Sequence, residues 1–182
     1  ELDGRKETFQ ELVQKGLGGF LVRNMESYGI LDTMGLTSRI VLDANIYTMN
    51  NRAEAFWMKK GILGDTVPLE LNAKELVHRN NKNSELTVYG YTPMMVSVQC
   101  VQKTMDHCNH ACVQYVLKDR YQKEFRGVCR CEFCYNTIYN TLPTSLLKEK
   151  EKAEKLGVKA YRLSFTTETQ QETEKIVRAF VD

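Results

Sequence analysis

Short apolar runs alternate with amphipathic helical segments along the first half of the chain. Phe9, Leu12 and Val13 have helical spacing and precede Gly16, which predicts a first helix that ends near this glycine. Further helices are predicted at residues 25–34, 52–60 and 73–78. The apolar runs predict strands at residues 19–22, 39–43, 67–71 and 85–90. Because continuous apolar strands that alternate with helices are typical of parallel sheets, the pattern predicts an α/β fold with helices covering a parallel sheet.

The alternation breaks after Gly90 and resumes near residue 146. Residues 91–140 form a cysteine-rich insertion, which contains a strand-like run at residues 114–117. A helix, a strand and a helix are expected after it, at residues 146–156, 160–164 and 169–181. We therefore expect a single domain over residues 1–182, barrel-like or doubly wound, with the insertion where strands lead into loops. In parallel α/β folds that end carries the functional site.

Helix starts in this pattern are marked by residues that can cap a helix. Asn51 and Asn72 each stand before a predicted helix, where an amide oxygen can accept a backbone N–H of the first turn. Thr167 and Gln170 have the spacing of a capping box before the last helix.

Composition and charge narrow the class of protein. The 182 residues carry 25 Lys and Arg against 23 Asp and Glu, a net charge of +2. This balance argues against a chain that coats nucleic acid electrostatically. The longest apolar stretches are too short to span a bilayer, and the start shows no basic and apolar leader, so we expect a cytoplasmic protein. Because the first residue is Glu1 and not Met, we expect a piece of a longer polypeptide.

All six cysteines fall within the insertion, which points to one local site. Cys131 and Cys134 are separated by two residues and can bind one metal from a tight turn, with Cys100 and Cys108 completing four thiolates. Both zinc and an iron–sulfur cluster fit. A single Cys-x-x-Cys pair with two singly spaced thiols favours the cluster, because zinc ribbons carry two such pairs. Free thiols in a reduced core are the alternative. His107 and His110 lie among the cysteines and are additional ligand candidates, whereas the roles of Cys112 and Cys129 are open.

Polar side chains stand at or near the predicted carboxyl ends of the strands. Two carboxylates and two guanidinium groups at one end could bind a charged substrate or transfer a proton, so we expect Asp43, Glu70 and Arg162 to be catalytic. Asn45 and Asn72 follow the two carboxylates and are candidate substrate-binding residues. The alternative interpretation is that the carboxylates cap loops or pair with Arg23 and Arg162, and that Asn72 is a helix cap. The sequence contains no Gly-x-Ser-x-Gly elbow, His-Glu-x-x-His helix, phosphate loop or dinucleotide fingerprint.

One stretch of the chain resembles a known family. The stretch Glu85-Leu-Thr-Val-Tyr-Gly-Tyr-Thr-Pro-Met-Met-Val-Ser-Val-Gln-Cys100 is similar to the strand, glycine, apolar stretch and cysteine of the collagenase-like peptidase family of unassigned catalytic type. Supporting pieces extend from about residue 40 to the end, and include Leu69-Glu70-Leu71-Asn72, Leu117-Lys118-Asp119-Arg120, Cys131-x-x-Cys134-Tyr135-Asn136 and Tyr161-Arg162-Leu163. The family signature has another cysteine shortly after the glycine, where this chain reads Thr92-Pro93-Met94.

The resemblance implies a TIM-barrel-like catalytic domain, of which this chain would be the C-terminal half with the cysteine insertion at the barrel mouth. It implies peptidase activity, including collagen degradation, or oxygen-independent hydroxylation of RNA or a ubiquinone precursor by an iron–sulfur protein. A structural zinc-binding fragment without activity is the third hypothesis. The cluster ligands carried over are Cys100, Cys108, Cys131 and Cys134. The implied partners are a peptide or RNA substrate and the N-terminal half of the same polypeptide. A half-barrel has open sheet edges, so we also expect homodimers of the fragment.

Overall fold

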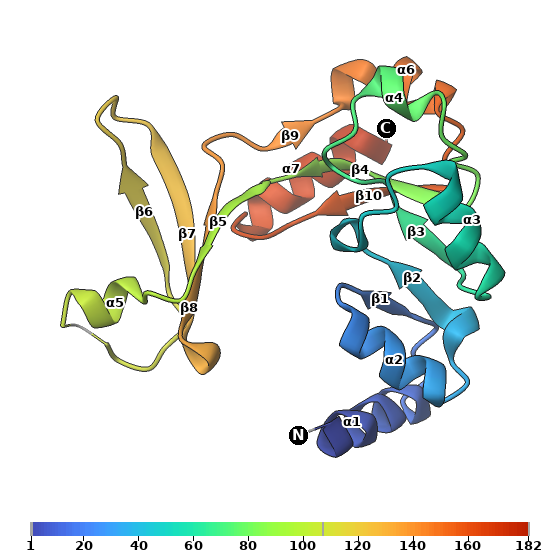
Figure 1. Ribbon diagram of the computed structural model, residues 1–182. Coiled ribbons are helices and arrows are strands. Elements are labelled where there is room, and N and C mark those ends of the chain that lie inside the picture. Colours follow the sequence, from blue (N-terminus) through green and yellow to red (C-terminus); the bar gives the residue numbers. More distant parts are fainter. Residues whose placement is uncertain (1, 107, 182) are drawn as a thin grey trace. The chain divides into compact units, whose positions relative to one another are not determined.

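The computed structural model describes residues 2–106 and 108–181. The chain is mixed α/β and divides into two compact units (Figure 1). Unit 1 comprises residues 1–87 and 149–162, and unit 2 comprises residues 88–148 and 163–182. Among the described residues no helix is long and apolar enough to cross a membrane.

The first sheet contains all but one of the strands that the apolar runs outside the insertion predict. Its strand order is β1-β2-β3-β4-β10, and β9 pairs antiparallel with β4. The pairs β1·β2, β2·β3 and β3·β4 are parallel, as expected from the alternation with helices. β4 and β10 each run from one unit into the other. The strand bounds are β1 Phe20–Val22, β2 Ile40–Leu42, β3 Gly64–Thr66, β4 Ser84–Gly90, β9 Thr144–Ser145 and β10 Ala160–Ser164.

One predicted strand is misplaced. The apolar run at residues 67–71 predicts a strand there, but β3 ends at Thr66 and residues 69 and 70 form a turn. The three residues of β3 are Gly64, Asp65 and Thr66, all buried. Because two of these side chains are polar, the hydrophobic pattern passes over this strand and selects the more apolar segment after it.

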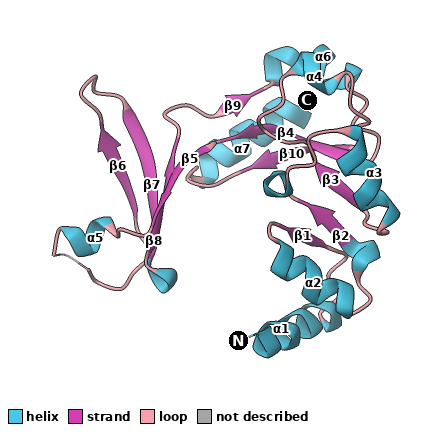
Figure 2. Ribbon diagram, viewed as in Figure 1, coloured by secondary structure: helices cyan, strands magenta, loops and turns pink. Residues whose placement is uncertain are grey.

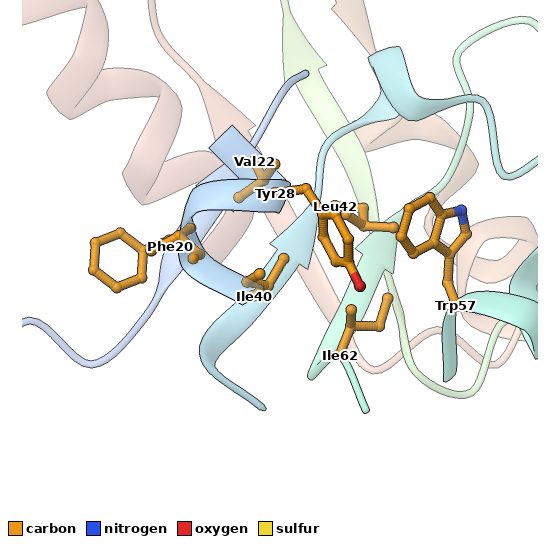
Figure 3. Packing of buried hydrophobic residues seen from close by; sticks show 8 residues of the cluster. Phe20, Val22, Tyr28, Ile40, Leu42, Trp57 and Ile62 are labelled. Carbon is orange, nitrogen blue, oxygen red and sulfur yellow. The ribbon is translucent and has the colours of Figure 1, made fainter. Parts of the chain in front are cut away.

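Helices α1, α2 and α3 of unit 1 pack on strands β1 and β2 through one apolar cluster. Leu31 of α2 and Trp57 of α3 are buried together with Ile40 and Leu42 of β2, and the Tyr28 and Trp57 rings meet edge to face with centroids 4.8 Å apart (Figure 3). The helix bounds in this unit are α1 Leu2–Gln14, α2 Met25–Thr33, α3 Asn51–Lys59, α4 Ala73–Leu76 and α6 Lys150–Lys155. Burial of these side chains supplies the main stabilisation of the unit.

Of the three predicted helix caps, Asn72 is confirmed, whereas Asn51 and Thr167 do not cap the helices that follow them. Asn72 caps α4 in a capping box with Glu75, as predicted. Asn50, and not Asn51, caps α3 by accepting the N–H groups of Arg52 and Ala53 at 3.0 Å. Asn51 instead ties the helix to the end of α4, since its amide accepts from the Asn80 N–H at 2.6 Å and donates to the His78 carbonyl at 3.1 Å.

A buried ion pair joins β3 to the segment after α4. Arg79 and Asp65 form an ion pair, and their side chains are only 2% and 3% exposed. The Arg79 guanidinium also donates to the Thr48 carbonyl at 2.8 Å and to Ser84 Oγ at 2.9 Å. Ser84 Oγ is 2.5 Å from Asp65 Oδ1. Buried charges of this kind are tolerated because almost every donor and acceptor has a partner.

Unit 2 contains a four-stranded antiparallel sheet that the sequence pattern predicts only in part. Its order is β5-β8-β7-β6, built from the 91–140 insertion (Figure 2). The run at residues 114–117 is confirmed as β6, but the other three strands of the sheet carry mixed polar and apolar residues without a clean alternation. The strand and helix bounds are β5 Pro93–Ser97, α5 Val101–Thr104, β6 Gln114–Lys118, β7 Glu124–Arg130, β8 Tyr135–Tyr139 and α7 Gln170–Val181.

The last helix, α7, begins at a capping box two residues later than the sequence spacing suggests. The Thr169 N–H donates to Glu172 Oε2 at 2.7 Å, and the Glu172 N–H donates to Thr169 Oγ1 at 3.2 Å. Thr167, the predicted cap, instead accepts from Arg126 Nη1 of β7 at 3.3 Å through its hydroxyl. Phe180 of α7 packs against Tyr89, with ring centroids 6.4 Å apart.

Candidate functional site

Three buried cysteines form a cluster in unit 2. Cys129 lies in β7, Cys131 follows directly after that strand, and Cys100 precedes α5. Their residues are 0%, 8% and 6% exposed, and Val113 and Tyr115 pack against them. The Sγ atoms of Cys100 and Cys129 are 3.6 Å apart. The six cysteines are all free thiols. The insertion therefore folds so that sulfurs distant in sequence meet.

A second group of donors is built around Cys131. The Sγ atoms of Cys108 and Cys131 and an imidazole nitrogen of His110 all lie within 4.8 Å of one another. Cys108 and His110 are exposed, whereas Cys131 is buried. A left-handed backbone conformation at His110 (φ 55°) turns the loop at this point.

Cys134 closes the Cys-x-x-Cys turn beside this group. A short 3₁₀ turn covers Cys131–Phe133, and the Cys134 N–H donates to the Cys131 carbonyl at 3.3 Å. Cys134 has φ 51°, and its thiol donates to the Cys131 carbonyl oxygen at 3.7 Å. The two cysteines of the motif thus belong to one tight turn, as their spacing predicts.

The thiols influence one another electrostatically. Burial, then the hydrogen bond and charge of Cys100, raise the pKa of Cys129 to about 12. Burial is also the main cause that raises the pKa of Cys131, with Cys108 and Cys134 adding to it. The backbone N–H of Lys103, at the start of α5, lowers the pKa of Cys100. The raised pKa values of Cys129 and Cys131 favour their protonated forms, and a metal ion bound to these thiols would displace the protons.

Two buried polar atoms next to the sulfurs have no hydrogen-bond partner among residues 2–106 and 108–181. They are the Tyr115 hydroxyl and Asn136 Oδ1. Asn136 stands opposite Cys129 in the β7·β8 register, so both side chains lie on one face of the sheet. Its Nδ2 donates to the Gln99 carbonyl at 2.8 Å, next to Cys100. Because buried polar groups are normally satisfied, these two atoms are consistent with a polar or ionic group bound at the cysteines.

The donor spacing fits a metal ion. Ligands at about 2.3 Å for sulfur around a tetrahedral ion lie roughly 3.8 Å from one another, as follows from the tetrahedral angle. The group Cys108, His110 and Cys131, within 4.8 Å, requires only small side-chain rotations to reach this geometry. A fourth thiolate is available from Cys134 in the same turn or from Cys100 in the adjacent cluster.

The predicted ligands are only part of this site. Cys100 and Cys131 lie in the buried cluster, and Cys108 joins Cys131 and His110. Cys129 completes the buried cluster. Its position beside Cys100 depends on the antiparallel register, so the spacing of the cysteines in the sequence assigns it no ligand role. Cys112 is exposed, and the predicted candidate His107 lies outside the described residues.

The polar residues predicted at the strand ends form a separate cluster within unit 1. Asp43, directly after β2, accepts from Arg23 Nε and from Arg162 Nη1 of β10, each at 2.9 Å. Arg162 also forms an ion pair with Glu85 of β4, whose Oε1 accepts from Thr66 Oγ1 at 2.8 Å. Arg23 extends the cluster by donating to Asn45 Oδ1 at 3.3 Å.

Two residues predicted for this cluster lie elsewhere in unit 1. Glu70 is exposed in the turn after β3, and the described part of the chain shows no hydrogen bond or ion pair from it to Asp43 or Arg162. The misplaced strand is the reason, and Glu85 supplies the second carboxylate in its place. Asn72 accepts from the N–H groups of Lys74 and Glu75, as expected for a helix cap.

A cavity of about 350 Å³ lies within unit 2, and the sequence did not signal it. Gln114, Val116, Glu124 and Arg126 line it, at strand positions whose side chains alternate with Tyr115 and Cys129. Arg126 stacks over the Tyr91 ring at 4.9 Å and reaches Glu172 Oε1 at 3.7 Å. Tyr91 and Glu172 therefore already interact with the Arg126 guanidinium charge.

We compared the chain with protein-family models, with curated proteins and with solved structures, and none of the three comparisons gave a match. The resemblance to collagenase-like peptidases therefore stays a prediction from the sequence.

Proposed function

We propose that unit 2 binds a thiophilic metal at the cysteine-rich end of its antiparallel sheet. The observation that carries this proposal is the convergence of the Cys108, His110 and Cys131 donor atoms within 4.8 Å. The two unpartnered polar atoms of Tyr115 and Asn136 near the buried thiols support it. Two separate segments supply the donors, so the metal would also tie the loop after α5 to the end of β7.

A single tetrahedral ion is the centre that this geometry supports best. Three thiolates and one imidazole make a Cys₃His set, which is common in structural zinc sites. Imidazole and thiolate together also suit zinc better than the alkaline-earth ions, which prefer oxygen ligands. We therefore assign Cys108, His110, Cys131 and Cys134 as the ligands of a zinc-type site.

An iron–sulfur cluster is the second candidate, and the number of thiols favours it. Cys100 and Cys129 add two sulfurs beside the proposed ion site, so four thiolates are available without the histidine. With a cluster, the ligands would be Cys100, Cys108, Cys131 and Cys134. Hydrogen bonds to cluster sulfurs tune the reduction potential, and the unpartnered hydroxyl of Tyr115, which packs against the buried cysteines, would be a candidate donor.

Metal analysis of the chain purified without oxygen separates these candidates. Stoichiometric zinc in a colourless protein supports the single ion. A brown protein with iron and acid-labile sulfide near a one-to-one ratio supports the cluster. A purified protein that contains neither zinc nor iron, although both metals were supplied during its preparation, contradicts the proposal.

Matched variants then locate the ligands. We expect Cys131→Ser and His110→Ala to lower the bound zinc and to change the Co²⁺ spectrum of the reconstituted site. Cys112→Ser and His78→Ala alter an exposed cysteine and an exposed histidine outside the donor group, so they serve as controls that keep full metal. Equal metal loss in the variants and the controls would contradict the assignment.

The polar cluster of unit 1 favours an enzymatic role as a further candidate, in line with the sequence resemblance. Asp43 directly follows β2, at the strand end where α/β enzymes bind substrates, and Arg162 of β10 links it to Glu85 of β4. We propose peptide hydrolysis, or hydroxylation of RNA or a quinone precursor, as the reaction classes to assay. Asp43→Asn should lower the activity at least tenfold, while Glu174→Gln on the exposed face of α7 should not. Loss of activity in Glu70→Gln would show that this exposed carboxylate also belongs to the site.

A further inference from the structure

Cys100 and Cys129 form a close thiol pair beside the Cys108, His110 and Cys131 group, and Cys131 is a neighbour of both thiols. Their Sγ atoms are 3.6 Å apart, with residue exposures of 6% and 0%. They come from segments 29 positions apart in sequence (129 − 100), one before α5 and one in β7. A disulfide has an S–S distance of about 2.05 Å, so the two sulfurs need to approach by roughly 1.5 Å.

We propose that Cys100 and Cys129 are a modification site, a dithiol that peroxide converts into a disulfide joining the start of α5 to β7. The approach is short, because the two Sγ atoms already lie 3.6 Å apart, and Cys100 stands at the start of α5, where the chain leaves a loop. The formed bond fixes that loop onto the sheet. Burial keeps bulky disulfide reagents away from the pair, so hydrogen peroxide is the oxidant class that fits.

The reaction balances with peroxide as the only co-reactant. One sulfur attacks a peroxide oxygen, the O–O bond breaks, and a sulfenic acid and one water form. The second sulfur then attacks the sulfenic sulfur, the S–O bond breaks and a second water leaves. The two sulfurs lose two electrons to the peroxide, and both thiol protons end in water. No metal takes part in either step.

The sequence allows the pair to be identified by peptide mapping. Trypsin cuts at Lys82, Lys103, Lys118, Arg126 and Arg130, which separates the cysteines into four peptides. Cys100 is alone in peptide 83–103, and Cys129 is alone in the four-residue peptide 127–130. Cys108 and Cys112 share peptide 104–118, while Cys131 and Cys134 share peptide 131–148. A Cys100–Cys129 disulfide therefore links two peptides that contain no other cysteine.

The experiment treats the folded full-length chain with a small excess of hydrogen peroxide, blocks remaining thiols after unfolding and maps the digest. We expect peptides 83–103 and 127–130 to be linked, and expect the link to survive in Cys112→Ser and to vanish in Cys129→Ser. Recovery of both peptides with blocked thiols, while other cysteines are cross-linked, would overturn the proposal. The wild-type map decides this outcome even when Cys129→Ser fails to fold.

The test is run on chelator-treated and metal-loaded protein, so that it does not depend on the proposed metal centre. A link in the chelated protein supports the proposal whether or not a metal ever binds. A link that also forms in zinc-loaded protein, with zinc retained, agrees with the ligand set Cys108, His110, Cys131 and Cys134. A link that forms only after chelation also supports the dithiol and adds Cys100 or Cys129 to the ligands. Absence of the link in both forms overturns the proposal.

Discussion

At Gly127 any side chain would collide with the ring of Tyr115. A Cβ placed there would lie 2.3 Å from Cε2 and from Cζ of that ring, and the two residues are direct cross-strand neighbours in β6·β7. The ring cannot simply move away, because it packs against the buried cysteines. Glycine at this position therefore lets an aromatic ring cover the thiol cluster, as in other aromatic and glycine pairs across strands.

We expect Gly127→Ala to destabilise the protein by about 1–3 kcal/mol, the usual cost of overpacking a filled interior. Urea unfolding monitored by circular dichroism measures this. Gly29→Ala in α2 is the matched control: its Cβ would meet nothing within 4 Å, and alanine in a helix interior stabilises by up to about 1 kcal/mol. Equal stability of the two variants would contradict the ring contact.

Arg79 is a second residue at which one substitution has a large expected effect. Arg79→Met removes one member of a buried ion pair and leaves Asp65 charged, only 3% exposed and without its cation. Loss of one partner of such a pair costs about 3–5 kcal/mol. Arg178→Met breaks an exposed pair with Glu174 and should cost less than about 1 kcal/mol. Thermal unfolding of both variants tests this, and a similar shift in Tm for both would contradict the structural role of the network.

At the scale of elements, hydrophobic periodicity predicts those that bury an apolar face. Strand β10 is predicted at its full extent, and α4 with its Asn72 cap is predicted within two residues. The hydrophobic pattern does not predict β3, because its buried residues include Asp65 and Thr66, whose burial depends on partners distant in sequence. The clustering of cysteines predicts a site, but the pairing of Cys129 with Cys100 follows from strand register, which the spacing of cysteines does not encode.

The start of α7 carries a pH-dependent contribution to stability. The Thr169 backbone N–H holds the pKa of Glu172 below its ordinary value, and Arg126 adds to this lowering. A carboxyl whose pKa is lower in the folded state stabilises the fold above its unfolded pKa, near 4.3, and this stabilisation is lost as pH falls through the folded value.

We therefore expect the wild-type urea midpoint to fall on acidification below about pH 5, and the fall to be smaller in Glu172→Gln. Glu174→Gln, two residues along the same helix, controls for removal of a charge from α7. An identical pH profile in wild type and Glu172→Gln would show that this carboxyl does not contribute.

At the scale of the whole molecule, the two units differ in what stabilises them. Unit 1 has an apolar cluster of strands and helices that includes Trp57, the single tryptophan of the chain. Unit 2 has a sheet whose buried cysteines take the place of part of such a core. Large apolar side chains remain exposed on β5, where Met94, Met95 and Val96 are 55% to 64% exposed. A metal would therefore contribute more to the stability of unit 2 than to that of unit 1.

Metal removal tests this difference. A ligand present at 100 times its Kd stabilises the state that binds it by about 2.7 kcal/mol, so chelation should lower the stability of β6–β8 by at least this amount. Hydrogen exchange of the β7 and β8 amides measures it, while Trp57 fluorescence reports the unfolding of unit 1. We expect exchange in β7 and β8 to accelerate on chelation and the Trp57 midpoint to stay constant. Equal shifts of both signals would mean that the two units unfold together, and no shift in either would contradict metal-linked stability.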